Sequence, residues 1–118
     1  MKVMLAEFCG FCFGVKRALQ IAERTQKENG EIYTDGPLIH NKQEVKRLCD
    51  EGIKELESDD QIEPGDTVLL RAHGVTEKRK SDLEERDIRV IDATCPRVTR
   101  AQKIIGEYTS RGHRGIII

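Results

Sequence analysis

Four cysteines and three histidines supply the reactive side chains of this 118-residue chain, and most of them lie in four short polar clusters. The clusters are 9–12 (CGFC), 40–41 (HN), 73–74 (HG) and 94–96 (TCP), and each follows an apolar run and precedes a helix-like stretch. If the apolar runs are parallel strands, every cluster lies at the carboxyl edge of one sheet, where open α/β folds bind ligands. Thiolates and imidazoles gathered there would suit a soft metal centre beside an anionic substrate.

Cys12 and Cys95 occupy positions that favour the thiolate. Cys12 lies in a glycine-flanked loop directly before a predicted helix, and Cys95 stands at an N-cap position one residue before Pro96. The free amides and positive dipole end of a helix stabilise a thiolate, which is the form that binds metal. We therefore expect these two cysteines to be metal ligands.

The other two cysteines carry weaker signals. Cys49 shares the apolar face of a predicted helix with Val45 and Leu48, so we expect a buried core thiol. Cys9 forms a Cys-x-x-Cys pair with Cys12, a pattern found in zinc sites and in dithiol redox sites alike. The sequence alone leaves the role of Cys9 open.

His40 and His73 each end a predicted strand and each precede a small or helix-capping residue. Imidazoles near helix amino ends hold phosphate groups or donate protons, and the residues alone leave both roles open for this pair. Arg71, two residues before His73, is either a structural ion pair or an anion contact. Arg17 and Arg47 sit one turn into predicted helices and are expected on solvated faces.

The elements that must position these side chains alternate along the chain. Apolar runs predict strands at 2–6, 31–34, 67–72 and 88–91, and 58–66 is an acidic surface connection. Helix signals follow the polar clusters, with Asn41 and Thr76 as caps, Pro96 in a first turn, and Gly30 and Gly52 as stops. This alternation predicts an α/β fold of β-loop-α units, with a mainly parallel sheet and helices on both faces. Residues 115–118 predict the start of one more strand, so we expect the chain to be part of something longer.

Composition excludes several function classes. The net charge is −1 and aromatic residues make up 4%, which argues against a nucleic-acid partner. No apolar stretch approaches the roughly 20 residues of a membrane span, so we expect no membrane association and a cytoplasmic location. A reducing compartment favours metal ligands or redox thiols over disulfides.

Four motifs, in this order, resemble the amino-terminal portion of the 4-hydroxy-3-methylbut-2-enyl diphosphate reductase (LytB) family. They are 10–15 (GFCFGV) with Arg17 and Ala18, 36–41 (GPLIHN), 71–75 (RAHGV) and 92–96 (DATCP). The resemblance spans nearly the whole chain. It implies one of three similar α/β units, with residues 1–95 forming the first unit and 96–118 beginning the second.

The resemblance also implies an iron-sulfur enzyme. In that family a 4Fe-4S cluster held by three cysteines removes the hydroxyl of an allylic diphosphate, yielding isopentenyl and dimethylallyl diphosphates. A donor such as ferredoxin or flavodoxin supplies the electrons. By motif, Cys12 and Cys95 look like the first two cluster ligands, and His40 and His73 look like diphosphate contacts.

The family's third cysteine, its proton-delivering glutamate and a third histidine would lie beyond Ile118, so we expect no catalytic residue within this chain. Cys9 and Cys49 match no family ligand. The chain alone is therefore expected to bind a cluster weakly or not at all, and to show no turnover.

Three other interpretations compete. A thioredoxin-like dithiol domain would use Cys9 and Cys12 but leaves Cys95 and both histidines without a role. A zinc module would combine those three cysteines with one histidine, although zinc sites more often use two close cysteine pairs. A dinucleotide-binding fold is weaker, because no Gly-x-Gly-x-x-Gly follows the first apolar run.

Overall fold

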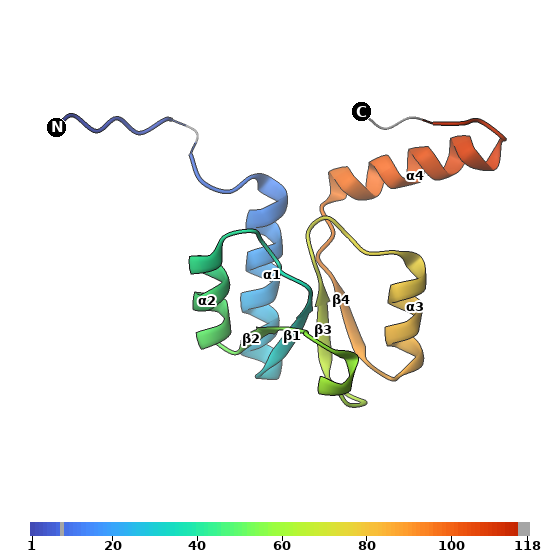
Figure 1. The fold of residues 1–118 in the computed structure, drawn as a ribbon, viewed down its shortest axis with the longest axis horizontal. Coiled ribbons are helices and arrows are strands. Elements are labelled where there is room, and N and C mark those ends of the chain that lie inside the picture. Colours follow the sequence, from blue (N-terminus) through green and yellow to red (C-terminus); the bar gives the residue numbers. More distant parts are fainter. Residues whose placement is uncertain (8, 116–118) are drawn as a thin grey trace.

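The computed structural model describes residues 1–7 and 9–115. Within them, helices and strands alternate along the chain (Figure 1). In chain order the elements are α1 (Phe13–Asn29), β1 (Ile32–Asp35), α2 (Lys42–Asp50), β2 (Ile53–Glu55), the 3₁₀ helix η1 (Asp59–Gln61), β3 (Thr67–Leu70), α3 (Glu77–Glu85), β4 (Arg89–Asp92) and α4 (Pro96–Ser110).

The strands form one four-stranded parallel sheet in the order β2-β1-β3-β4. The register aligns the last residues of three strands, because Asp35 pairs with Leu70 and Leu70 pairs with Asp92. The loops that follow β1, β3 and β4 therefore leave the sheet at the same level. The predicted parallel α/β fold is confirmed.

Helices cover both faces of the sheet, as predicted. Side chains of successive strand residues point to opposite faces, and β3 shows this alternation directly. Leu69 packs with α1 and α2 in one core cluster, whereas Val68 and Leu70 pack with Leu83 of α3 in the other. The strand β3 is buried along its whole length, whereas the edge strand β4 has no fully buried residue. Figure 1 shows α1 and α2 on one side of the sheet and α3 on the other.

The predicted helix signals are confirmed by the observed caps. The Asn41 side chain accepts hydrogen bonds from the first-turn amides of α2, and the Thr76 hydroxyl accepts one from the amide of Arg79 in α3. Gly30 ends α1 with φ +82°, a conformation that L side chains rarely adopt. The two side-chain caps fix where α2 and α3 begin.

Two strand predictions were wrong. Residues 2–6 form no strand, and Val3, Met4 and Leu5 are exposed in an extended segment that leads away from the sheet (Figure 1). A strand requires a partner edge as well as an apolar run, and this segment pairs with none in the described part of the chain. The strand β2 was missed because it has only three residues, of which Ile53 alone is buried.

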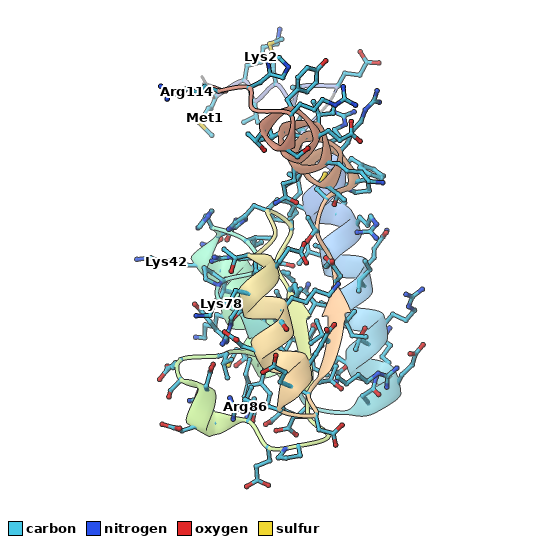
Figure 2. All side chains as sticks on the ribbon, turned by 90° about the vertical axis from the view of Figure 1, so that its right-hand side faces the viewer. Met1, Lys2, Lys42, Lys78, Arg86 and Arg114 are labelled. Carbon is cyan, nitrogen blue, oxygen red and sulfur yellow. The ribbon has the colours of Figure 1, made fainter. Side chains whose placement is uncertain are left out.

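The last helix is exposed, although its apolar spacing was recognised. None of the described residues of α4 is buried, and Ile104, Ile105 and Tyr108 are 45%, 39% and 54% exposed. Figures 1 and 2 both show α4 standing apart from the sheet and its covering helices. The predicted strand at 115–118 falls largely outside the described residues, and the division of the chain at residue 95 stays a prediction.

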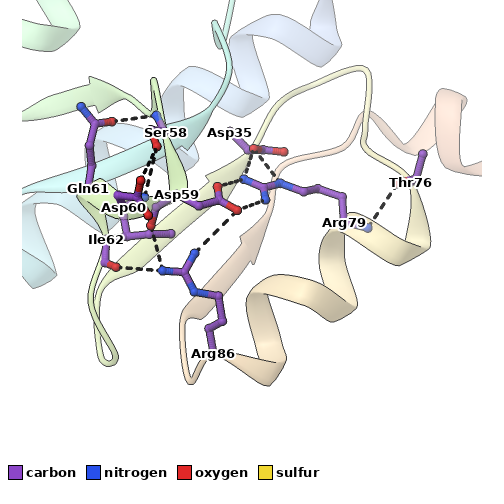
Figure 3. A network of polar contacts seen from close by, with 9 residues as sticks. All are labelled: Asp35, Ser58, Asp59, Asp60, Gln61, Ile62, Thr76, Arg79 and Arg86. Carbon is purple, nitrogen blue, oxygen red and sulfur yellow. Dashed lines mark hydrogen bonds and ion pairs between the residues drawn. The ribbon is translucent and has the colours of Figure 1, made fainter.

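An ion-pair network anchors the acidic connection between β2 and β3 (Figure 3). Arg79 of α3 pairs with Asp35 at 2.9 Å and with Asp59 of η1 at 2.7 Å. Arg86 donates to the carbonyl oxygens of Asp59 and Ile62. Hydrogen bonds from Arg79 hold the pKa of Asp59 below its ordinary value. The connection was predicted to be a surface segment, and this network fixes it to both ends of α3.

Replacing Arg79 tests the importance of this network. The variant Arg79→Met leaves two carboxylates without their shared cation, and Asp35 is only 15% exposed. We expect a loss of about 2 kcal/mol in the free energy of unfolding, measured by urea denaturation. The control Lys78→Met changes an exposed residue of the same helix and should alter stability by less than about 0.5 kcal/mol. Equal stability of the two variants would refute this role for Arg79.

Candidate functional site

The two imidazoles predicted to meet do so. The His40 and His73 rings stack with centroids 5.7 Å apart and an interplanar angle of 20°. His40 lies in the loop after β1 and His73 in the loop after β3, and these strands are neighbours in the sheet. The contact follows from the level ends of adjacent parallel strands.

The environment of His73 favours its neutral form. Partial burial lowers the pKa of the His73 imidazole, and the positive charge of Arg71 and the nearby His40 lower it further. Each of these causes disfavours a second positive charge at the same place. An anion bound beside the ring would counteract them.

The stability of the fold should reflect this lowered pKa. As the pH falls through the ordinary imidazole value of 6.5, the unfolded chain takes up a proton at His73 before the folded chain does. Folding stability is therefore lost below that pH and levels off once the folded state also binds the proton. We expect the free energy of unfolding to fall less in His73→Gln than in the unmodified chain between about pH 7.5 and about pH 5. A larger fall in the variant would contradict the assignment.

Cys12 and Cys95 are the N-cap residues of α1 and α4, and neither side chain caps its own helix. A Cβ atom built at Gly14 in the first turn of α1 would lie 2.8 Å from the Cys95 Sγ atom. The sulfur of Cys95 therefore rests on the start of the helix that Cys12 begins. The sequence predicted that these two cysteines share one edge of the fold, and the start of α1 and the loop after β4 do lie together.

Three hydrogen bonds hold the Cys95 loop in place. Arg17 Nη1 donates to the carbonyl oxygen of Thr94 at 3.2 Å and to that of Ala93 at 3.4 Å. The Cys95 amide donates to the carbonyl oxygen of Ala72 at 2.7 Å. Because Ala72 immediately precedes His73, this last bond ties the cysteine loop to the histidine loop. The expectation of a solvated Arg17 was wrong.

Asp92, the last residue of β4, shapes the turn that leads to Cys95. Its Oδ1 atom accepts a hydrogen bond from the Thr94 amide at 2.9 Å. Burial alone would raise the pKa of Asp92, but the hydrogen bonds from Thr94 and the positive charges of Lys80 and Arg17 together outweigh it, so the pKa lies below the ordinary value. The ionised carboxylate therefore holds the turn closed at neutral pH.

Substitution of Gly14 tests the packing between α1 and Cys95. In Gly14→Ala the new methyl group meets the sulfur and the Cβ atom of Cys95, so one of the two elements must move. We expect a loss of about 1–3 kcal/mol in the free energy of unfolding and faster labelling of Cys95 by a thiol reagent.

The matched control is Gly106→Ala in α4, where nothing lies within 4 Å of the added Cβ. This change should be neutral or stabilise the helix by about 0.5–1 kcal/mol. If Gly14→Ala is as stable as Gly106→Ala, the packing argument fails.

A hollow of about 350 Å³ connects the helix start with the two histidine loops. Its lining combines apolar side chains with both imidazoles, from Phe11, Val15, Leu38, Ile39, His40, Asn41, Ala72 and His73. Such a lining suits a ligand with a short hydrocarbon part and an anionic part.

Two further predictions need correction. Cys49 is exposed, because α2 packs against the edge strand β2 and buries only Leu48. Arg47 is not simply solvated, since it pairs with Glu23, Glu44 and Glu51. Cys9 is exposed and its role stays open.

The described residues contain no group of three or more His, Cys, Asp or Glu side chains that could hold a metal ion. The thiols of Cys12 and Cys95 are both free. Two thiols at uncapped helix starts are suitable metal ligands, but two ligands alone do not complete the coordination of a metal centre.

A family model described as "LytB protein" matches residues 3–118, nearly the entire chain. The chain belongs to the LytB family. Among the described residues, no helix has the length and apolar character to cross a bilayer.

Curated LytB relatives share the name 4-hydroxy-3-methylbut-2-enyl diphosphate reductase. The protein of Aquifex aeolicus is 40% identical over 117 residues, covering 98% of this chain and 40% of its own length. That of Campylobacter concisus is 43% identical over 118 residues, covering 99% and 42%. The chain thus spans about two fifths of the length of these relatives.

Solved structures agree with this assignment. One is described as (E)-4-hydroxy-3-methyl-but-2-enyl diphosphate reductase, the terminal enzyme of the non-mevalonate pathway. It matches with a TM-score of 0.81 and 42% identity, over 94% of this chain and 40% of that one. The reductase from Plasmodium falciparum matches with a TM-score of 0.82 and 28% identity, over 86% and 32%. The LytB fold is therefore shared over nearly all of this chain.

Proposed function

We propose that the protein containing this chain is an iron-sulfur reductase acting on (E)-4-hydroxy-3-methylbut-2-enyl diphosphate in non-mevalonate isoprenoid biosynthesis. In the overall reaction the allylic C–O bond breaks, two electrons and two protons are consumed, and the hydroxyl leaves as water. The products are isopentenyl and dimethylallyl diphosphates. The names of the LytB relatives support this substrate class.

One observation carries the proposal. The stacked pair of His40 and His73 is joined to the Cys95 loop by the bond from the Cys95 amide to Ala72, and Cys95 in turn packs on the helix begun by Cys12. The segments that carry the two cysteines and the two histidines are thus neighbours. This combination suits a redox metal centre next to an anionic group.

Cys12 and Cys95 would supply two cysteine ligands of a 4Fe-4S cluster. When bound, such a cluster supplies electrons and an iron with an open coordination position that acts as a Lewis acid. Among the described residues, no third His, Cys, Asp or Glu side chain completes a metal site with these two cysteines. Arg17 keeps the Cys95 sulfur in place by holding the preceding carbonyl oxygens.

His40 and His73 would bind the diphosphate group. Their exposed rings face the hollow whose apolar wall includes Phe11, Val15 and Ile39, and this wall would hold the five-carbon part of the substrate. The lowered pKa of His73 means that binding of the anion also draws a proton onto the ring. These side chains would bind and orient the substrate.

The proposal includes a partner and a location. Electrons would come from a small carrier such as ferredoxin or flavodoxin, in the cytoplasm. Free thiols in a metal-ligand role are typical of a reducing compartment.

Cysteine substitutions in the full-length protein test the proposal. We expect Cys12→Ser and Cys95→Ser each to abolish the visible chromophore of the anaerobically purified protein and to lower its iron content. Each removes a thiolate ligand that serine does not replace well. Absorption spectra and iron analysis provide the measurement.

Cys49→Ser is the matched control, because Cys49 is exposed on α2 and should leave the chromophore unchanged. Loss of colour in Cys49→Ser together with retention in Cys12→Ser would overturn the ligand assignment. A dithiol function of Cys9 and Cys12 would appear instead as accelerated reduction of insulin by dithiothreitol.

A further inference from the structure

Arg71 joins the starts of the two loops that carry the histidines. It is the first residue after β3 and precedes His73 by two positions. Its guanidinium crosses to the loop after β1, where a Cβ atom built at Gly36 would lie only 2.9 Å from Arg71 Nη1. Gly36, with φ +78°, thus leaves the space that this guanidinium fills.

The charge of Arg71 has no protein partner in the described part of the chain. Its Nε atom is buried and has no hydrogen-bond partner there, and none of the ion pairs found among those residues includes it. Asp35, which precedes Gly36, already pairs with Arg79. The Nε atom itself is enclosed, but Arg71 as a whole is only partly buried and lines a hollow, so its positive charge is available to an anionic ligand.

The space beside Arg71 offers several more donors. A hollow of about 790 Å³ is lined by Arg71 and His73, together with hydroxyl, amide and ammonium groups from Thr76, Gln102 and Lys103. Glu77 is the one acidic residue in this lining. Since His73 also lines the hollow that contains His40, its ring stands between the two spaces. An anionic group that extends from the histidine pair past His73 would reach the guanidinium.

We propose that Arg71 is a third cationic contact for the diphosphate of the substrate, binding the phosphoryl group that His40 does not reach. This inference rests on the proposed function, because it takes the ligand of the histidine pair to be a diphosphate ester. A guanidinium stays charged at any physiological pH and binds phosphoryl oxygens in a bidentate geometry. Arg71 is thus a binding residue, and the bond-breaking step belongs to other groups.

The test uses the full-length protein and calorimetric titration with inorganic diphosphate. Arg71→Met keeps a side chain of similar length and removes the charge, and we expect it to weaken binding roughly 10- to 100-fold. The effect on inorganic phosphate should be smaller, because one phosphoryl group can be held by the histidines alone. Arg24→Met, which changes an exposed guanidinium of α1, is the control and should bind diphosphate normally.

Arg71→Lys is a second test in case Arg71→Met fails to fold. It preserves the charge without the bidentate fork, so we expect a folded protein with roughly 3- to 10-fold weaker diphosphate binding. Unchanged diphosphate affinity in Arg71→Met would overturn the proposal. If the Met variant does not fold, unchanged affinity in Arg71→Lys would overturn it instead.

A histidine variant separates this inference from the proposed function. If His40→Gln loses diphosphate binding while both Arg71 variants bind normally, only the role of Arg71 is refuted. If His40→Gln also binds normally, the diphosphate site itself is refuted.

Discussion

The parallel register of β1, β3 and β4 is the constraint on which the candidate site depends. Asp35, Leu70 and Asp92 are aligned across the sheet, so three loops leave it at one level. A shift of one residue in either pairing would move a loop by about 3.3 Å and reverse the face toward which its strand side chains point. The stacked His40 and His73 rings therefore depend on backbone pairing that involves neither histidine.

The loops that follow the aligned strand ends form a site because arginine side chains and a backbone amide connect them. Arg17 reaches from α1 to the carbonyl oxygens before Cys95, and the Cys95 amide reaches Ala72. Arg71 crosses from the end of β3 to Gly36. On the face covered by α3, Arg79 and Asp59 fix the long connection that precedes β3. Each contact joins segments far apart in the sequence, so the geometry of the site is a property of the whole fold.

The parts of this arrangement that depend on local sequence signals could be predicted from the sequence. The buried run of β3, the caps at Asn41 and Thr76, and Pro96 in a first turn were all recognised, and they place the polar clusters at helix starts. The meeting of the histidines followed from assuming parallel strands. The motifs also identified the LytB family, which the family comparison supports.

The rest depends on non-local contacts that a local pattern does not contain. Residues 2–6 have the composition of a strand but no partner, whereas β2 has a partner and a composition that is mostly polar. Cys49 falls on the apolar side of α2, yet this helix covers only the sheet edge and buries a single residue. Arg17 and Arg47 look like surface cations in sequence, and only the fold shows the carbonyl and carboxylate oxygens that they meet.

The uncapped starts of α1 and α4 have a further electrical consequence. Cys12 and Cys95 leave their first-turn amides unused by side chains, and the packing of Cys95 on Gly14 brings both helix starts to the same place. Two positive dipole ends lower the energy of negative charge nearby. A redox group held there would accept an electron at a higher potential than at a similar site without helix starts, so the backbone itself would favour its reduced state.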